Sequence, residues 1–521
     1  MAAAWCVGSA AARADRQDNS DIQYRIFREN LPLIAALMVV YAAISWLVAA
    51  AGARASQAVR RLLRVGFLAV MSTVFLAALH GTQAPKVVLL ALGNYALVHV
   101  AERALPPRAV VPLVFAYNCA ALIGVFYTDG VPYGKLHPGL AWLDEHSGLL
   151  PRWYINFNFS MLRLISFACD YHWAVRAAAA DTHGSAARAH GAANRRPDPP
   201  PAFAPPETTP DARERTRRPR SVGDYSLVNY LLYVFYPPLF IAGPVITFND
   251  FCAQLQHPLH IGIGTMARYA VRVAACVLVM EFVLHYMYVN AIKNARAWLG
   301  DSPMELSMIG FWNLIFVWLK VRRAARDFTD PQLLIPWRVF RLWSLLDGVD
   351  APENMIRCMA NNYSALAFWR SWHRSYNLWV VRYIYIPVGG ARNLLPAVLL
   401  VFTFVALWHD LSFTLLTWAW LVTLFIAPEV LATYLLPARR FGKYAWYRHV
   451  CAIGAVGNIL MMMTANLVGF VVGTDGVQYI WRELTAGWYG VRFLLVASAC
   501  LFVGAQAVSY THLRAHETEA D

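Results

Sequence analysis

The fold class of this chain is set by residues 394–428, which read LLPAVLLVFTFVALWHDLSFTLLTWAWLVTLFIAP. A straight helix crosses the hydrocarbon core of a bilayer with about 20 residues, so this run of 35 is predicted to form two membrane helices with a break near Trp408, His409 and Asp410. His409 and Asp410 are its only ionisable side chains. Because a polar side chain costs free energy in hydrocarbon, His409 is a functional-site hypothesis.

The composition of the whole chain agrees with a membrane fold. Of its 521 residues, 58% are hydrophobic and only 15% are charged, which excludes a series of ordinary soluble domains. Apolar stretches lie near residues 31–51, 62–82, 86–102, 109–128, 154–174, 226–247, 267–290, 305–321, 394–410, 411–436, 450–472 and 489–509. We predict an all-α polytopic membrane protein with about 10–12 transmembrane helices.

Two stretches are imperfect as membrane spans. Residues 154–174 carry Arg163 and Asp170, and residues 332–347 are short and rich in arginine and tryptophan. Such segments fit re-entrant or interfacial helices, which are tolerated where protein or a watery cavity satisfies the backbone. They indicate a cavity within the membrane domain.

Charge gathers between the apolar stretches. The net charge of +14 lies in loops, so we expect contacts with anionic head groups and a phosphate-rich cosubstrate, and not with nucleic acid. Basic clusters flank residues 305–321 on both sides, so either this helix is re-entrant or one cluster faces the lumen. The predicted segments are an N-terminal tail (1–25), N-terminal transmembrane helices (26–175), a disordered basic cytosolic loop (176–224), the core (225–508) and a polar tail outside the fold (509–521).

The eight cysteines form neither a C-x-x-C pair nor a spacing typical of metal ligands. We therefore predict that they are core residues and that the chain has no metal site.

Residues 368–383, FWRSWHRSYNLWVVRY, are the second informative block. At 100° per residue, one helical stripe collects Trp369, Trp372, Tyr376, Trp379 and Tyr383, and a neighbouring face collects Arg370, His373, Arg374 and Asn377. An interfacial girdle is the common role of such an aromatic stripe. The two arginines fit either snorkelling to head groups or binding a cosubstrate phosphate.

A turn follows this predicted helix. Pro387 and the Gly389-Gly390 pair end the helix and would bring its polar face back towards His409. In a continuous helix Asp410 points about 100° away from His409, so we do not predict an Asp–His dyad. The candidate catalytic residues are His409 and His373, and the candidate substrate-binding residues are Arg370, Arg374, Asn377 and Trp408.

Several longer motifs add a family resemblance. They are YPP at 236–238, AGP at 242–244, TFNDF at 247–251, DGVDAPENM at 347–355, FWRSWHRSYNLWVVRYIYIPVGG at 368–390 and ALWHD at 406–410. Together they resemble the membrane-bound O-acyltransferases, most of all the glycerol-uptake-protein branch, close to the Hedgehog acyltransferases. The resemblance covers residues 25–505 apart from the basic loop, and makes residues 225–508 an acyltransferase core.

That resemblance implies helices around a central tunnel, entered by acyl-CoA from the cytosol and by a lumenal or lipid acceptor from the other side, with no bound cofactor. His409 matches the family's near-invariant histidine, and His373 matches a second polar site held by histidine, asparagine or aspartate according to branch. Hedgehog acyltransferases have aspartate there, so a histidine favours a hydroxyl acceptor. The glycerol-uptake branch implies an endoplasmic reticulum membrane and a lyso-lipid or glycosylphosphatidylinositol (GPI) acceptor.

The residues alone support the same chemistry. An alcohol is a weak nucleophile at neutral pH, so acyl transfer to it needs a base, for which we assign His409. His373 would orient the acceptor or stabilise the oxyanion, helped by Asn377. Because no serine or cysteine motif indicates an acyl-enzyme, direct transfer is preferred.

The sequence is also compatible with other functions. A glycerol or polyol transporter also places polar residues in a membrane cavity, although neither an internal repeat nor a matched pair of broken helices is evident. A protein acyltransferase of the Hedgehog type and a non-catalytic scaffold on the same fold are the remaining alternatives.

Overall fold

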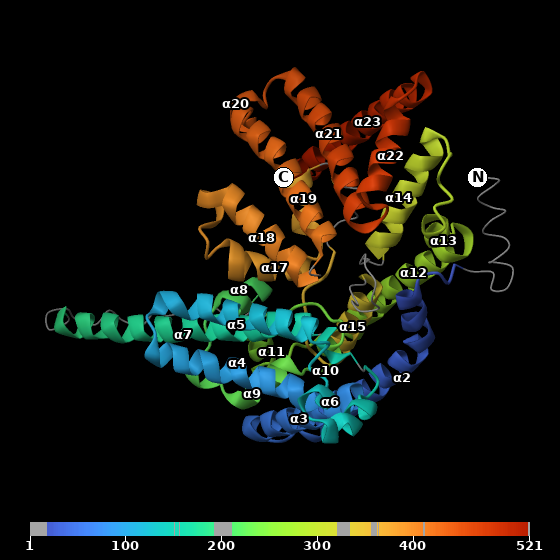
Figure 1. Cartoon of the computed structure of the whole chain (residues 1–521). Helices are drawn as coiled ribbons and strands as arrows, with labels where there is room; N and C mark the ends of the chain where they lie inside the picture. The colour runs from blue at the N-terminus through green and yellow to red at the C-terminus, as the bar shows by residue number, and fades with distance from the viewer. Residues whose placement is uncertain are drawn as a thin grey trace. The chain divides into compact units, whose positions relative to one another are not determined.

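The computed structural model describes residues 18–150, 152–155, 157–191, 211–319, 334–355, 362, 364–409 and 412–518 (Figure 1). Throughout these residues the regular elements are helices, which confirms the all-α prediction. Seven helical stretches in the described part of the chain are long and apolar enough to cross a membrane. They are Tyr24–Ala51, Gln57–Ala104, Pro107–Tyr127, Gly390–His409, Leu415–Leu435, Ala445–Phe470 and Trp488–Val508. The chain is therefore an integral membrane protein.

The helices form two compact units. The N-terminal unit comprises Ile34–Ala267 with Phe340–Pro352, and the C-terminal unit comprises Arg268–Val339 and Glu353–Asp521 with Met1–Leu33. Three helices pass from one unit into the other along the chain: α2 (Ile22–Ala51), α12 (Ile263–Tyr286) and α15 (Leu334–Leu346).

Three long helices lie side by side in the N-terminal unit, namely α4 (Ala84–Ala104), α5 (Pro107–Tyr127) and α7 (Phe157–Gly191) (Figure 1). At their contact the amide of Asn118 donates to Asn94 Oδ1 over 2.8 Å, and both residues are fully buried. The helices of this unit are α3 (Gln57–His80), α4 (Ala84–Ala104), α5 (Pro107–Tyr127), α6 (Tyr133–Leu136), α7 (Phe157–Gly191), α8 (Ala212–Arg217), α9 (Leu227–Val234), α10 (Pro237–Phe240) and α11 (Phe248–Gln256).

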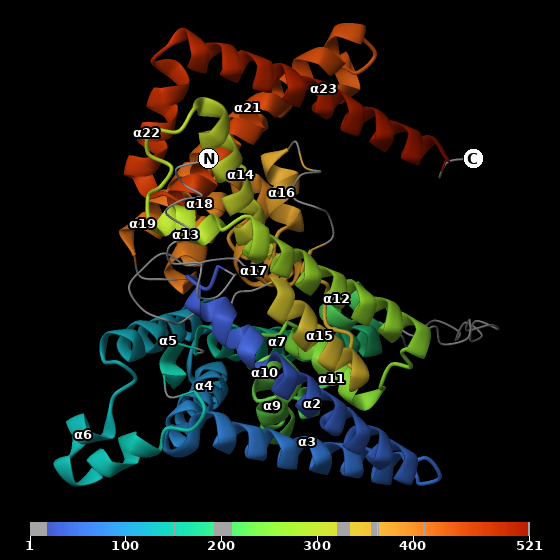
Figure 2. The ribbon, with the colours of Figure 1, turned by 90° about the vertical axis from the view of Figure 1, so that its right-hand side faces the viewer.

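The C-terminal unit is built on the run 394–428. Its two predicted membrane helices are present as α18 and α19, and α18 ends at His409, which confirms the predicted break. Asp410 lies outside the described residues. The helices of this unit are α13 (Val289–Asn294), α14 (Pro303–Leu319), α16 (Ala365–Ser371), α17 (Arg374–Val380), α18 (Leu394–His409), α19 (Phe413–Leu435), α20 (Ala438–Phe441), α21 (Ala445–Phe470), α22 (Gly473–Thr485) and α23 (Trp488–Thr518). Helix α19 packs on both α18 and α21, and α21, α22 and α23 pack together (Figure 2).

The apolar stretch 226–247 is not a membrane span, contrary to the prediction. Helix α9 ends at Val234, and Pro237 begins the single turn of α10, because proline fits the first turn of a helix and not its interior. The buried guanidinium of Arg163 in α7 donates to the carbonyl oxygens of Val234, over 2.7 Å, and Leu239. Carbonyl groups freed by the broken helix are thus satisfied by an arginine that first looked out of place in an apolar stretch.

The predicted basic loop and polar tail are partly helical. Helix α7 continues to Gly191, and α8 lies before residue 224, where the Nε of Arg215 is 2.6 Å from Asp250 Oδ1. Helix α23 continues into the predicted tail as far as Thr518. Residues 192–210 and the basic cluster at 320–326 lie outside the described part of the chain. The domain boundaries themselves stay predictions.

The cysteines are less uniform than predicted. Cys169 and Cys252 are buried, whereas Cys451 and Cys500 are exposed on α21 and α23. Core packing therefore accounts for only some of the cysteines that the structure describes.

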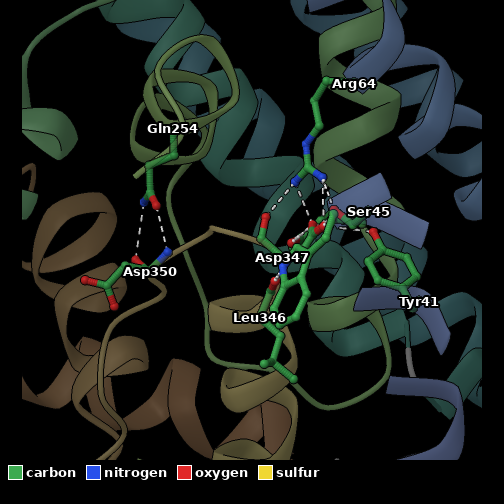
Figure 3. A network of polar contacts seen from close by, with 9 residues as sticks. Tyr41, Ser45, Arg64, Gln254, Leu346, Asp347 and Asp350 are labelled. Atoms are coloured by element: carbon green, nitrogen blue, oxygen red, sulfur yellow. Dashed lines mark hydrogen bonds and ion pairs between the residues drawn. The ribbon is translucent and has the colours of Figure 1, made fainter. Parts of the chain in front are cut away.

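Asp347 joins three helices of the N-terminal unit (Figure 3). Its fully buried carboxylate accepts two bonds of 2.7 Å from Arg64 on α3 and one of 2.6 Å from Ser45 on α2, and it also accepts the hydroxyl of Tyr236. A bidentate arginine–carboxylate pair with extra hydrogen bonds is the geometry that makes a buried charge tolerable. The first residue of the DGVDAPENM motif thereby fixes the end of α15.

Candidate active site

The C-terminal unit contains a mostly apolar, partly open cavity of about 300 Å³ between α16, α17, α18 and α19. Both candidate catalytic histidines, His373 and His409, line it. Their side chains come from elements that are separate in the sequence, so the turn at Gly389-Gly390 does return the chain as predicted. Other lining residues are Leu366, Trp369, Arg370, Trp372, Tyr376 and Asn377.

His373 occupies a helix break, and the single helix predicted for residues 368–383 is wrong. Helix α16 ends at Ser371, α17 begins at Arg374, and His373 between them has a φ of 42°. A non-glycine residue in this left-handed region is strained by about 1–3 kcal/mol, so contacts from outside the segment must hold it.

Asn354 supplies those contacts. Its backbone oxygen accepts the N–H of Arg374 over 2.7 Å, and its side-chain oxygen lies 3.2 Å from His373 Nδ1. Asn354 closes the DGVDAPENM motif, so that motif has a direct structural link to the cavity. Sequence reasoning did not assign Asn354 to the site, although its place in the motif was a usable signal.

The break also redistributes the predicted basic face. Arg370 is exposed and lines the cavity with Asn377. The side chain of Arg374 is not among the cavity-lining groups and donates from Nη1 to the backbone oxygen of Arg370 over 3.3 Å. In a continuous helix the two arginines would lie on the same face. In the structure only Arg370 lines the cavity.

The aromatic stripe packs inwards against α18. Tyr376 stacks on Trp408 with ring centroids 4.4 Å apart, and Trp379 stacks on Phe404 at 5.8 Å. Trp408 is buried and does not line the cavity, and its ring centroid lies 4.8 Å from that of His409. These contacts are those of a packed wall, and they restrict the rotamers around His409.

Three residues that line the cavity carry buried polar atoms that have no hydrogen-bond partner among the described residues. They are His373 Nε2, Tyr376 Oη and Trp369 Nε1. Burial lowers the pKa of His373 to about 3, so its imidazole is neutral at physiological pH. A neutral imidazole has one nitrogen able to accept a proton and one able to donate a hydrogen bond.

Glu429 on α19 holds the beginning of α16. Its carboxylate accepts the hydroxyl of Ser364 and the backbone N–H groups of Ala365, over 2.7 Å, and Leu366. The amide of Asn458 on α21 donates to the same carboxylate over 3.2 Å. An acid directly after the run 394–428 was visible in the sequence, but its partner helix was not.

Within the residues that the structure describes, there is no group of three or more His, Cys, Asp or Glu side chains able to hold a metal ion. The cavity offers imidazole, phenol, indole, amide and guanidinium groups within apolar walls. Such a set can bind an apolar chain that carries a polar, proton-donating or carbonyl group.

Comparisons with known proteins give a consistent result. The model of the membrane-bound O-acyltransferase family matches residues 146–474. Membrane-bound O-acyltransferase GUP1 of Saccharomyces cerevisiae is 41% identical over 493 residues, which cover 94% of this chain and 81% of the yeast protein. Membrane-bound O-acyltransferase GUP2 of the same yeast is 33% identical, with 98% of this chain and 80% of that protein covered. Protein-cysteine N-palmitoyltransferase HHAT of Mus musculus is 29% identical over 275 residues, which cover 50% of this chain and 52% of the mouse protein.

Proposed function

This chain belongs to the membrane-bound O-acyltransferase family, and we propose that it transfers a fatty acyl group from acyl-CoA to the hydroxyl of a lipid. The proposed acceptor is a lyso-GPI anchor, and the proposed site of action is the endoplasmic reticulum membrane. The observation that carries the proposal is that His373 and His409 line one apolar cavity.

In the proposed reaction His409 is the general base. One of its ring nitrogens takes the proton of the acceptor hydroxyl as the oxygen attacks the thioester carbonyl carbon. The tetrahedral intermediate then expels the thiolate of CoA, which takes up the proton from His409. His373, neutral and held by Asn354, orients the acceptor hydroxyl through Nε2.

The lining residues also suit the two substrates. The apolar walls formed by Val398, Phe402 and Ile426 fit an acyl chain. Arg370, exposed at the cavity, is the group that would meet a phosphate of CoA, and Asn377 supports the polar end of the cavity. Arg374 and Trp408 keep only a supporting role in the proposal, the first beside Arg370 and the second behind His409.

The test compares purified wild type with His409→Ala in detergent or proteoliposomes. Transfer of a labelled acyl group from acyl-CoA to a lyso-lipid is expected to fall by about 10²- to 10⁴-fold, the usual contribution of a general base. His449→Ala is the matched control, because His449 is exposed on α21 and contacts Gln506. Undiminished transfer by His409→Ala would remove the base assignment.

The same preparations separate the alternatives. Uptake of radiolabelled glycerol by proteoliposomes without any acyl transfer would support the transporter. Transfer to a peptide amine in preference to a lyso-lipid would support a protein acyltransferase, the activity that the name of the mouse relative gives to that protein. Lipid mass spectrometry of cells without the protein, rescued by wild type or by His409→Ala, identifies the acceptor.

A further inference from the structure

The proposed reaction gives no role to the hydroxyl of Tyr376, a residue that lines the cavity. Tyr376 is only 5% exposed, and its Oη is buried without a hydrogen-bond partner among the described residues. Its ring is fixed between Trp408, with centroids 4.4 Å apart at 21°, and Trp379, at 6.2 Å and 4°. The position of the hydroxyl is therefore determined by packing, while its hydrogen bond is missing.

The other buried tyrosines in the described part of the chain do not share that deficit. Tyr230 Oη donates to the backbone oxygen of Ala91, and Tyr233 Oη donates to that of Ile246, both over 2.7 Å. A buried hydroxyl without a partner costs free energy, and phenylalanine would provide the same stacking without that cost. The hydroxyl of Tyr376 therefore calls for a partner that is bound only during function.

Tyr376 lies in the right place for such a partner. It lines the cavity shared by His373 and His409, and it follows His373 by one turn at the start of α17. The Nε2 of His373 lacks a partner among the described residues too, so two unpaired polar atoms belong to residues that lie one turn apart and line the same cavity. Burial raises the pKa of Tyr376 well above its ordinary value of 10, so the phenol keeps its proton and is able to donate a hydrogen bond.

We propose that Tyr376 Oη donates a hydrogen bond to the carbonyl oxygen of the acyl thioester and stabilises the oxyanion that forms there. This role rests on the proposed acyl transfer. When the acceptor oxygen bonds to the carbonyl carbon, the C=O π electrons move to the carbonyl oxygen, which Tyr376 then holds. The carbonyl re-forms as the carbon–sulfur bond breaks, the thiolate leaves, and the proton on His409 passes to it. Tyr376 keeps its own proton throughout.

The deciding variant is Tyr376→Phe, which removes one oxygen atom and keeps the ring stack. Its kcat is expected to fall by about 10²- to 10³-fold with KM for acyl-CoA little changed, as for the loss of one oxyanion donor. The unfolding temperature of the purified protein is expected to stay the same or rise, because no internal hydrogen bond is lost. This combination differs from a structural role, in which activity and stability would fall together.

Tyr447→Phe is the matched control. The hydroxyl of Tyr447 on α21 donates to the backbone oxygen of Leu436 over 3.0 Å, and Tyr447 does not line the cavity. Its loss is expected to lower the unfolding temperature slightly and to leave kcat unchanged.

Two results would overturn the role of Tyr376: an unchanged kcat in Tyr376→Phe, or a parallel loss of kcat and unfolding temperature. Hydrolysis of the acyl-CoA thioester in the absence of acceptor passes through the same oxyanion and is measured in the same variants. Wild type that cleaves the thioester but acylates no lipid hydroxyl would refute the proposed function alone, provided that cleavage depends on Tyr376. Wild type that neither cleaves the thioester nor acylates a lipid hydroxyl would refute both.

Discussion

His373 combines burial, a left-handed backbone and aromatic packing. It is 6% exposed, it has a left-handed backbone, and its ring packs against Trp337 at 5.0 Å between centroids. Burial is the only cause of its lowered pKa, without a contribution from a charged neighbour. The imidazole is therefore kept neutral by desolvation, which suits a group that must form hydrogen bonds to a substrate and must not carry charge in an apolar cavity.

A pH dependence of stability follows from this. The pKa of His373 is about 3 in the folded protein, whereas an unfolded histidine has a pKa of about 6.5. Between these values the unfolded chain binds a proton that the folded chain does not, so the contribution of His373 is fully present above about pH 6.5 and is lost as the pH falls towards 3. Wild type is expected to lose up to about 1.4 kcal/mol per pH unit more than His373→Asn across this window. Thermal unfolding at a series of pH values measures the difference, and parallel curves for the two proteins would contradict it.

Two short helices, α16 and α17, form the cavity together with the longer helices α18 and α19. Helix α16 has seven residues, too few to be stable alone, and Glu429 binds its first turn from α19. An acid at the N-terminus of a helix also complements the helix dipole. A side chain on one membrane helix thereby sets the position of the segment that leads to His373.

Glu429→Ala is expected to destabilise the protein by about 1–3 kcal/mol, because it leaves the N–H groups of α16 and the amide of Asn458 without their acceptor. Glu429→Gln keeps one carbonyl oxygen as an acceptor, so its loss of stability is expected to be roughly half that of Glu429→Ala. Thr433→Ala, one turn further along α19, removes only a local bond to a backbone oxygen and is the control. Thermal unfolding gives the ranking, and equal losses in Glu429→Ala and Thr433→Ala would show that the cap contributes nothing.

The elements also show what could be predicted from the sequence. The break at His409 was predictable, because the thickness of a bilayer limits how long one apolar helix can be. The break at His373 was not, because the contacts that impose it come from Asn354, which lies 19 positions away in the sequence. A helical wheel assumes one unbroken helix, so it placed Arg370 and Arg374 on one face. It assigned Tyr376 to the aromatic stripe by its ring alone, and its hydroxyl received no role.

At the scale of the whole molecule, each unit is stabilised by polar contacts inside apolar surroundings. In the N-terminal unit the centre is Asp347 with Arg64, and the amide of Gln254 forms a second pair with the backbone of Asp350, over 2.7 and 3.2 Å (Figure 3). Lipid offers no hydrogen bonds, so these contacts replace what water supplies to loops in soluble proteins.

Removal of one partner of the Arg64–Asp347 ion pair should therefore strongly destabilise the protein. Asp347→Ala is expected to cost about 3–5 kcal/mol of stability, because Arg64 loses its counter-ion in a largely buried site. Arg64→Met combined with Asp347→Leu is expected to cost less, since no unpaired charge is left. Glu29→Ala is the surface control, because its pair with Arg25 is exposed and contributes roughly 0.5 kcal/mol or less. Thermal unfolding distinguishes these cases. A double variant that is less stable than Asp347→Ala would contradict the explanation by an unpaired charge.

The left-handed backbone at His373 restricts which residues fit this position. Outside glycine, the residues that adopt this conformation most readily are asparagine, aspartate and histidine. These three are also the residues that the family resemblance assigns to this position in different branches. Asparagine or aspartate at position 373 is therefore expected to keep this backbone conformation, so the side-chain chemistry can change there while the loop stays the same.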